Sequence, residues 1–232
     1  MYGINDKKED FDHHINIMYG YKYLYKVPEF KKALGFGASW GHEFIPIIEK
    51  IKELHIIDSS QQTISSKIDN LYPIYHVSQI SGKINFPDNS FDLINCLSTL
   101  HHIPNVTFVL NELFRVLKPN GYMLLKEPVT SMGDWQVNRD GLTVNERGIP
   151  PALLEKIIID AGIKIVHRHY FNSMTSFLIR ISNKNAFFNT KIYHIIDKYL
   201  SYFLKFNMHY HPHNKLQRIC PQVVFYVLKK NS

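Results

Sequence analysis

Short apolar runs alternate along the chain with segments in which apolar residues recur at helical spacing. The runs predict buried strands at residues 33–36, 54–57, 74–77, 91–96, 122–125 and 163–166. Helical spacing between them predicts helices at residues 43–53, 63–71, 106–117 and 151–161. Strands that alternate with helices imply right-handed crossovers and a mostly parallel sheet covered on both faces. The pattern therefore predicts an α/β fold.

Proline and glycine mark the ends of two predicted helices. Pro119-Asn120-Gly121 follows the apolar stripe of residues 106–117, and it removes a backbone donor and offers a left-handed turn. Pro151 begins the next helix and Gly162 follows it.

The chain has 232 residues, of which 45% are hydrophobic, and this suits one folded domain rather than a disordered chain. We divide it into an N-terminal helical segment (1–30), a core (31–169), an insert (170–219) and a final strand with a tail (220–232). Two cysteines do not make a disulfide framework or a cysteine-rich zinc site. The N-terminus lacks the apolar core of a signal peptide, and no apolar run approaches the ~20 residues that span a bilayer. We therefore expect a cytoplasmic protein.

Charge is distributed unevenly. Residues 1–162 hold 16 basic and 19 acidic residues, whereas residues 163–232 hold 11 basic residues and one acid, Asp197. This asymmetry indicates an anionic partner for the C-terminal part, or a basic face that serves only solubility.

The most informative turn follows the first predicted strand. Gly37, Ser39 and Gly41 alternate there, and glycine lets the backbone turn tightly and approach a ligand. Asp58 lies 21 positions after Gly37 at the end of the second strand, where a carboxylate accepts hydrogen bonds from the ribose hydroxyls of a nucleoside. The alternative is a structural turn in which Asp58 caps the following helix through Ser59 and Ser60.

Two further motifs make the pattern specific. The first runs from Phe86-Pro87-Asp88-Asn89-Ser90-Phe91-Asp92 to Leu100-His101-His102-Ile103, and the second is Arg115-Val116-Leu117-Lys118-Pro119-Asn120-Gly121. Together with the glycine turn they resemble the class I S-adenosylmethionine-dependent methyltransferases of the small-molecule group. The resemblance is strong over residues 33–128 and implies a Rossmann-like sheet of seven strands, with residues 221–228 as the final antiparallel strand.

The resemblance implies a binding site for S-adenosylmethionine. The glycine turn would hold its methionine end and Asp58 its ribose, and the end of strand four would line the pocket. The residues so assigned are Gly35, Gly37, Ser39, Gly41, Asp58, Ser59, Ser81, Cys96 and Leu97. Gly35 stands where the family usually has an acid, Ser39 replaces a glycine, and Gln79-Ile80-Ser81 stands where an acid often meets the adenine.

Methyl transfer requires an aligned nucleophile and, for a hydroxyl acceptor, a base. His101, His102 and Glu127 follow predicted strands and are the candidate bases, although one histidine of the pair is expected to be structural and Glu127 equally suits bracing a loop. The long connection 127–150 is expected to cover the site. Its candidate substrate contacts are Asp134, Trp135, Arg139 and Arg147, with the alternative that Trp135 anchors the loop and Arg147 pairs with Glu146 or Asp140.

The insert carries a predicted helix over residues 187–206, with aromatic residues flanked by lysines. Such a helix suits peripheral contact with a membrane, a lid or a dimer face. The segment His209-Tyr210-His211-Pro212-His213 lacks metal-ligand spacing, and we expect no metal and no nucleic acid.

The sequence thus predicts a methyltransferase acting on a small, anionic acceptor, most simply a hydroxyl of a sugar, sugar phosphate or lipid-linked glycan in polysaccharide biosynthesis. The alternatives are a lipid, quinone or amine acceptor, and a degenerate, non-catalytic domain.

Overall fold

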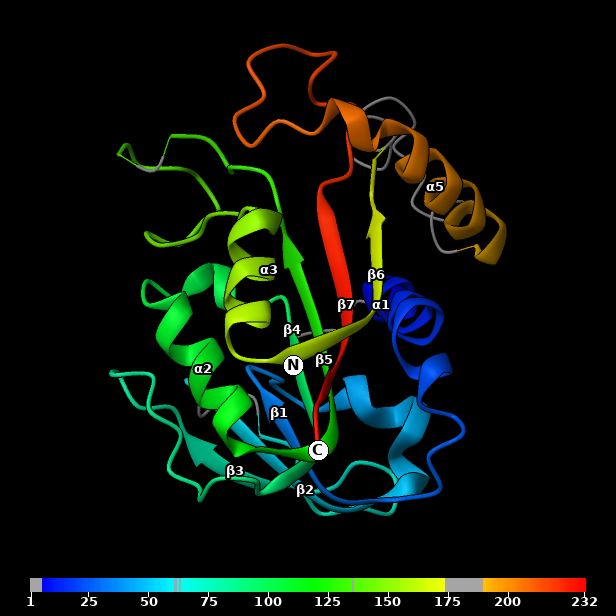
Figure 1. Ribbon diagram of the computed structural model, residues 1–232, viewed down its shortest axis with the longest axis vertical. Helices are drawn as coiled ribbons and strands as arrows, with labels where there is room; N and C mark the ends of the chain where they lie inside the picture. The colour runs from blue at the N-terminus through cyan, green and yellow to red at the C-terminus, as the bar shows by residue number, and fades with distance from the viewer. Residues whose placement is uncertain (1–5, 61, 63, 135, 174–189) are drawn as a thin grey trace.

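Seven strands form a single mixed sheet in the order β3-β2-β1-β4-β5-β7-β6 in the computed structural model of the chain (Figure 1). The structure describes residues 6–60, 62, 64–134, 136–173 and 190–232. The strands are β1 Phe30–Phe36, β2 Ile51–Asp58, β3 Ile74–Val77, β4 Phe91–Leu97, β5 Leu117–Pro128, β6 Ile163–Phe171 and β7 Val223–Lys230. The predicted fold class is confirmed.

Strands β1 to β5 run parallel to one another, and β7 pairs antiparallel with both β5 and β6. The final antiparallel strand is therefore confirmed. Pro128 at the end of β5 and Phe171 at the end of β6 both pair with Val223. The carboxyl ends of these two strands consequently lie level at one edge of the sheet.

Helices cover both faces of the sheet (Figure 1). On one face, α2 (Val106–Val116) and α3 (Pro151–Asp160) pack against apolar side chains of β1, β4, β5 and β7. On the other face, α1 (Asp6–Tyr19) and the 3₁₀ helix η2 (His42–Lys50) form a second core with the alternate side chains of the strands. α5 (Lys191–Leu204) follows β6. Alternation of side chains along each strand supplies apolar groups to both cores.

Several elements differ from the sequence prediction. The expected helix 43–53 is the shorter η2, because Pro46 lies inside it and β2 begins at Ile51. The expected helix 63–71 is wrong: the described residues there form turns and an isolated bridge between Ile68 and Leu71. Ile68 is buried but Ile64 is exposed, so this segment has no continuous apolar stripe to pack.

The helix expected at residues 106–117 is confirmed, and it ends at Val116. β5 starts at Leu117, well before the predicted residue 122. The left-handed residue in this connection is Asn120, with φ 63°, rather than Gly121. A Cβ on Gly121 would lie 2.8 Å from the Lys118 carbonyl oxygen, so close backbone approach explains the glycine.

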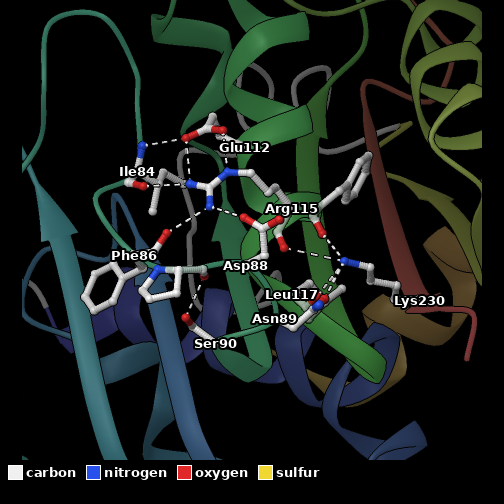
Figure 2. Close-up of polar contacts among 11 residues, drawn as sticks. Ile84, Phe86, Asp88, Asn89, Ser90, Glu112, Arg115, Leu117 and Lys230 are labelled. Carbon is white, nitrogen blue, oxygen red and sulfur yellow. Dashed lines mark hydrogen bonds and ion pairs between the residues drawn. The ribbon is translucent and has the colours of Figure 1, made fainter.

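Arg115 ties the loop before β4 to α2 (Figure 2). Its guanidinium donates to the Glu112 carboxylate, to the Asp88 carboxylate at 2.7 Å, and to the backbone carbonyls of Ile84 and Phe86. The Glu112 carboxylate also accepts the Ile84 N–H at 2.9 Å, and its pKa is lowered mainly by the bond from Arg115. These motif residues thus serve the fold.

Lys230 performs a similar task at the end of β7 (Figure 2). Its ammonium donates to the Asn89 side chain at 2.9 Å, to the carbonyl of Phe114 in the last turn of α2, and to the carbonyl of Leu117, the first residue of β5. A cation at a helix C-terminus satisfies carbonyls that lack partners within the helix.

None of the helices in the described part of the chain has the length and apolar character needed to cross a bilayer.

Candidate functional site

A cavity of about 460 Å³ lies at the carboxyl ends of β1 to β4. The chain order in the sheet reverses between β1 and β4, and ligands of open α/β sheets bind at such a point. The wall is formed mainly by residues that follow these strands, namely Phe36, Gly37, Asp58, Ser59, Ser78, Gln79, Ile80, Ser98, Thr99 and His102. Its size is that of a small-molecule site.

The turn after β1 forms one side of the cavity. Gly37 has φ 69°, its N–H donates to the Ile57 carbonyl at 2.8 Å, and a Cβ there would lie 2.3 Å from the Thr99 side chain. Gly41 is also left-handed, and a Cβ on it would meet Ile56 and Ile68. Both positions therefore require glycine.

Asp58 closes this turn from the end of β2. Its two carboxylate oxygens accept the N–H of Ser39 at 2.8 Å and the N–H of Ser60 at 2.9 Å. The helix expected after Asp58 is absent from the described residues, so the carboxylate braces the turn instead of capping a helix. Each oxygen keeps a lone pair, and Asp58 lines the cavity, so it fits the hydroxyls of a ribose.

The other residues assigned to the cofactor fall into two groups. Ser59 lines the cavity with Gly37 and Asp58. The cavity wall does not include Gly35, Ser39, Gly41, Ser81, Cys96 and Leu97. Cys96 and Leu97 are buried core residues of β4, and the cavity wall at this strand is formed by Ser98 and Thr99, which follow it.

The glycine that replaces the usual acid at the end of strand one has a packing reason. A Cβ on Gly35 would lie 2.6 Å from the Ala38 Cβ and 2.9 Å from the Phe44 ring. A carboxylate side chain does not fit there without repacking this turn.

Glu127 is fully buried, and its carboxylate accepts hydrogen bonds from backbone N–H groups. Its Oε1 accepts the N–H of Thr99 at 3.0 Å and of Leu100 at 2.7 Å, while its Oε2 accepts the His101 N–H and lies 2.8 Å from His101 Nδ1. The carboxylate therefore holds the 3₁₀ turn η3 (Leu100–His102) against the end of β5. This geometry favours the bracing alternative for Glu127 and the structural role for His101, which is buried.

His102 is the member of the pair that lines the cavity. Its Nδ1 lies 3.1 Å from the Thr143 hydroxyl and 3.5 Å from the Glu146 carboxylate. Burial, and then the charge of His101, lowers the pKa of His102, so the ring is neutral near pH 7 and able to accept a proton. His101, His102 and Glu146 each bring a potential metal-ligand atom to within 4.8 Å of one another. The expectation of no metal stays a prediction.

The connection after β5 places its polar residues differently from the prediction. Arg139 donates to the carbonyls of Met132, Thr143 and Val144, so it stabilises the loop itself. Asp134 accepts the Gln136 N–H and is exposed. Trp135 lies outside the described residues.

Arg147 lies on a second cavity of about 530 Å³, which shares Pro104 and Asn105 with the first. Its guanidinium donates to the carbonyls of Asn145 and Pro104, rather than to Glu146 or Asp140. Tyr210, from the loop before β7, lines the same cavity and donates to the Gly148 carbonyl at 2.7 Å. Arg147 therefore lines the second cavity and is held against Pro104, which lines both.

The sequence assignment omitted Ser78, Ser98 and Thr99. Each comes within two residues of the end of an apolar strand, where the first polar residues of a parallel sheet face a ligand. Their position directly after a strand is the sequence feature that predicts them as site residues. Thr99 also donates to the Phe36 carbonyl at 3.1 Å and so joins the ends of β4 and β1.

Comparison with known proteins agrees with this geometry. Residues 34–125 match a family model described as a methyltransferase domain. An uncharacterized methyltransferase, YcgJ of Bacillus subtilis, is 29% identical over 99 residues, which cover 40% of this chain and 39% of that protein. The crystal structure of YcgJ superposes with a TM-score of 0.62 at 16% identity and covers 95% of this chain and 99% of its own.

A second similar structure is a complex with the cofactor. Phosphoethanolamine N-methyltransferase 2 of Haemonchus contortus, in complex with S-adenosyl-L-methionine, superposes with a TM-score of 0.62 at 13% identity and covers 95% of this chain and 53% of its own.

Residues 34–125 thus match a methyltransferase domain, and the chain shares its fold with S-adenosylmethionine-dependent methyltransferases of the class that the sequence motifs resemble. The match over residues 34–125 and the fold shared with YcgJ agree with the resemblance of this chain to that class. The sequence match spans about two fifths of the curated relative YcgJ, whose description names no acceptor.

Proposed function

We propose that this chain transfers a methyl group from S-adenosylmethionine to a hydroxyl of a small anionic acceptor, such as a sugar phosphate or a lipid-linked glycan. The observation that carries the proposal is the cavity at the ends of β1 to β4, where a ribose-compatible carboxylate and a neutral histidine line the same wall. When bound, the cofactor supplies an activated methyl group on a sulfonium.

Different residues of the cavity wall would contact different parts of the cofactor. Asp58 would accept the ribose hydroxyls with the lone pairs that Ser39 and Ser60 leave free. Gly37 would let the backbone approach the ligand, and Ser78 and Gln79 follow β3, where the adenine is bound in the family that this chain resembles.

His102 would remove the proton of the acceptor hydroxyl. Its lowered pKa keeps the imidazole unprotonated at neutral pH, and the Thr143 and Glu146 contacts fix Nδ1, which leaves Nε2 as the proton acceptor. Glu127 and His101 would act by positioning η3, which carries His102.

The acceptor class follows from charge. Arg147 lines the second cavity and donates to the carbonyl of Pro104, which lines both cavities, and its planar fork suits a phosphate or carboxylate. Residues 163–232 hold 11 basic residues and one acid, so the surrounding chain favours an anionic ligand. We place the enzyme in the cytoplasm, where glycan precursors attached to the membrane are within reach.

The test is a turnover assay that measures S-adenosylhomocysteine with panels of phosphorylated sugars, neutral sugars, lipids, quinones and amines. We expect turnover with an anionic hydroxyl acceptor and an increase in KM of about tenfold for Arg147→Ala, with kcat little changed. Arg139→Ala, which removes only contacts within the loop, is the matched control. Turnover confined to neutral or amine acceptors contradicts the acceptor class. A folded protein that binds cofactor but methylates nothing supports the non-catalytic alternative.

A further inference from the structure

Helix α5 is amphipathic, but the side that packs on the rest of the domain carries polar residues. His194, Asp197 and Ser201 are buried on that side. The Asp197 carboxylate accepts the N–H groups of Asn172 and Ser173 at 2.6 and 3.0 Å. A helix that packs on its own domain normally buries its apolar side, so the contacts of α5 with the sheet do not account for its apolar residues.

The apolar residues of α5 face outward instead. At about 100° per residue they occupy one arc on the side opposite Asp197 and Ser201. Tyr202, Phe203 and Phe206 are 74, 69 and 86% exposed, and the arc also includes Ile192, Ile195, Ile196 and Tyr199. We call this set, with Phe206 from the following 3₁₀ turn, the α5 apolar face. So large a contiguous exposed apolar patch marks an interaction site.

Cations border the α5 apolar face. Lys198 and Lys205 lie seven residues apart on one side of the helix. Burial, and then the charge of Lys198, lowers the pKa of Lys22. The only acid in residues 190–232 is Asp197, and it is buried. No carboxylate of this segment therefore neutralises the surface.

The loop that follows α5 adds two exposed cations, Lys215 and Arg218. Its other exposed side chains include Leu216 and the histidines at 209, 211 and 213. In Figure 1 this loop and α5 lie at the end of the molecule where β5 and β6 terminate. Because the parallel strands share that edge, the α5 apolar face is on the same end of the molecule as the cavity.

From this combination we infer that the α5 apolar face and its lysines dock on an anionic lipid surface. Aromatic and aliphatic side chains bordered by lysines match the chemistry of a membrane interface, where the rings lie at the headgroup level and the ammonium groups meet phosphates. A second copy of this chain fits less well, because pairing two such faces brings Lys198 and Lys205 of both copies together without acids. The inference rests on the proposed function only in that a lipid-linked acceptor would then be presented to the site.

The inference is tested by sedimentation of the full chain with vesicles of phosphatidylcholine alone and with added phosphatidylglycerol. We expect binding to the anionic vesicles that weakens with salt. The variant Phe203→Ser/Phe206→Ser should lower the partition coefficient about tenfold or more, because two exposed rings leave the interface. Lys198→Glu/Lys205→Glu should abolish the preference for phosphatidylglycerol.

Two controls match these variants. Tyr72→Ser removes an aromatic ring that is as exposed as Phe203 but lies next to β3, and Lys164→Glu reverses a charge at the opposite end of β6. Neither should alter vesicle binding. Thermal denaturation and S-adenosylmethionine titration in solution show whether each variant is folded.

The possible results distinguish a lipid surface from a second copy of the chain as the partner of the α5 apolar face. No binding by the wild-type chain, or equal binding by the Phe203→Ser/Phe206→Ser variant, overturns the inference. Self-association that these substitutions abolish, without vesicle binding, assigns the face to a second copy and overturns it too. Vesicle binding by a protein that binds no cofactor supports the docking surface while it contradicts the proposed function.

Discussion

Replacing Glu127 distinguishes the bracing role from a catalytic one. The carboxylate is completely buried and accepts three backbone N–H groups, from Thr99, Leu100 and His101, as well as the contact with His101 Nδ1. In Glu127→Ala these donors lose their acceptor at the start of a short 3₁₀ turn. We therefore expect the substitution to unfold or shift η3 and to destabilise the whole chain.

The expected magnitude follows from the number of orphaned donors. A buried donor left without a partner costs about 1–3 kcal/mol, and partial entry of water reduces the sum over three of them. We expect the free energy of unfolding to fall by about 3–5 kcal/mol, which for a chain of this size lowers Tm by roughly 10 °C. Glu127→Gln keeps one acceptor oxygen but turns an amide toward other donors, so it should lose about half as much.

Urea denaturation followed by circular dichroism measures this effect, with Asp140→Ala as the control for loss of an exposed acid. The turnover assay on the same samples completes the test. A Glu127→Ala protein that keeps its stability within about 1 kcal/mol yet loses activity would refute the bracing role and restore Glu127 as a catalytic residue.

Further predictions concern the turn, the base and the motif arginine. Gly37→Ala should weaken cofactor binding at least tenfold, because φ is 69° and the new Cβ overlaps a neighbouring side chain; Gly162→Ala has the same φ with open space around it and should cost only about 1 kcal/mol of stability. Calorimetry and denaturation of the two variants separate overlap from backbone strain. The kcat should fall as the pH drops below the pKa of His102, which lies under its ordinary 6.5, and should be level above it. His102→Gln should lower kcat about 10²–10⁴-fold and remove this acidic limb, and a limb that persists in the variant excludes His102 as the base. Arg115→Ala should lower the free energy of unfolding by about 2 kcal/mol and Tm by roughly 4–8 °C, and a shift under 1 °C contradicts the network in Figure 2.

Local patterning explains which elements the sequence predicts well. The run at residues 91–96 is mostly apolar, with Asp92 and Asn95 as its polar residues, because β4 is buried on both faces. Helix α2 shows an apolar stripe because it packs on one side. The segment 63–71 has enough apolar residues to suggest a helix, but among its described residues Ile68 alone is fully buried, and Leu71 packs partly buried against the same core. The structure of this segment therefore depends on its contacts with the core rather than on the spacing of its apolar residues.

The site is harder to predict because its partners are distant in sequence. Asp58 is predicted because strand, turn and acid follow one another within a single unit. The buried pairing of His101 with Glu127 joins the ends of β4 and β5, and nothing in either segment shows that the carboxylate is already occupied by backbone donors. The α5 apolar face is visible as an apolar stripe in the sequence, but which side of the helix turns to the fold depends on the bonds of Asp197.

The most direct test of the central claim is calorimetric titration of S-adenosylmethionine and S-adenosylhomocysteine into the full chain and into Asp58→Ala, with Asp140→Ala as control. The account predicts one saturable site in the wild-type and control proteins. Asp58→Ala should bind about 10²- to 10⁴-fold more weakly, since two hydrogen bonds to a charged acceptor are lost at about 1.5–3 kcal/mol each. A folded wild-type chain that binds neither compound, or an Asp58→Ala protein with unchanged affinity, would contradict the placement of the cofactor at the ends of β1 to β4.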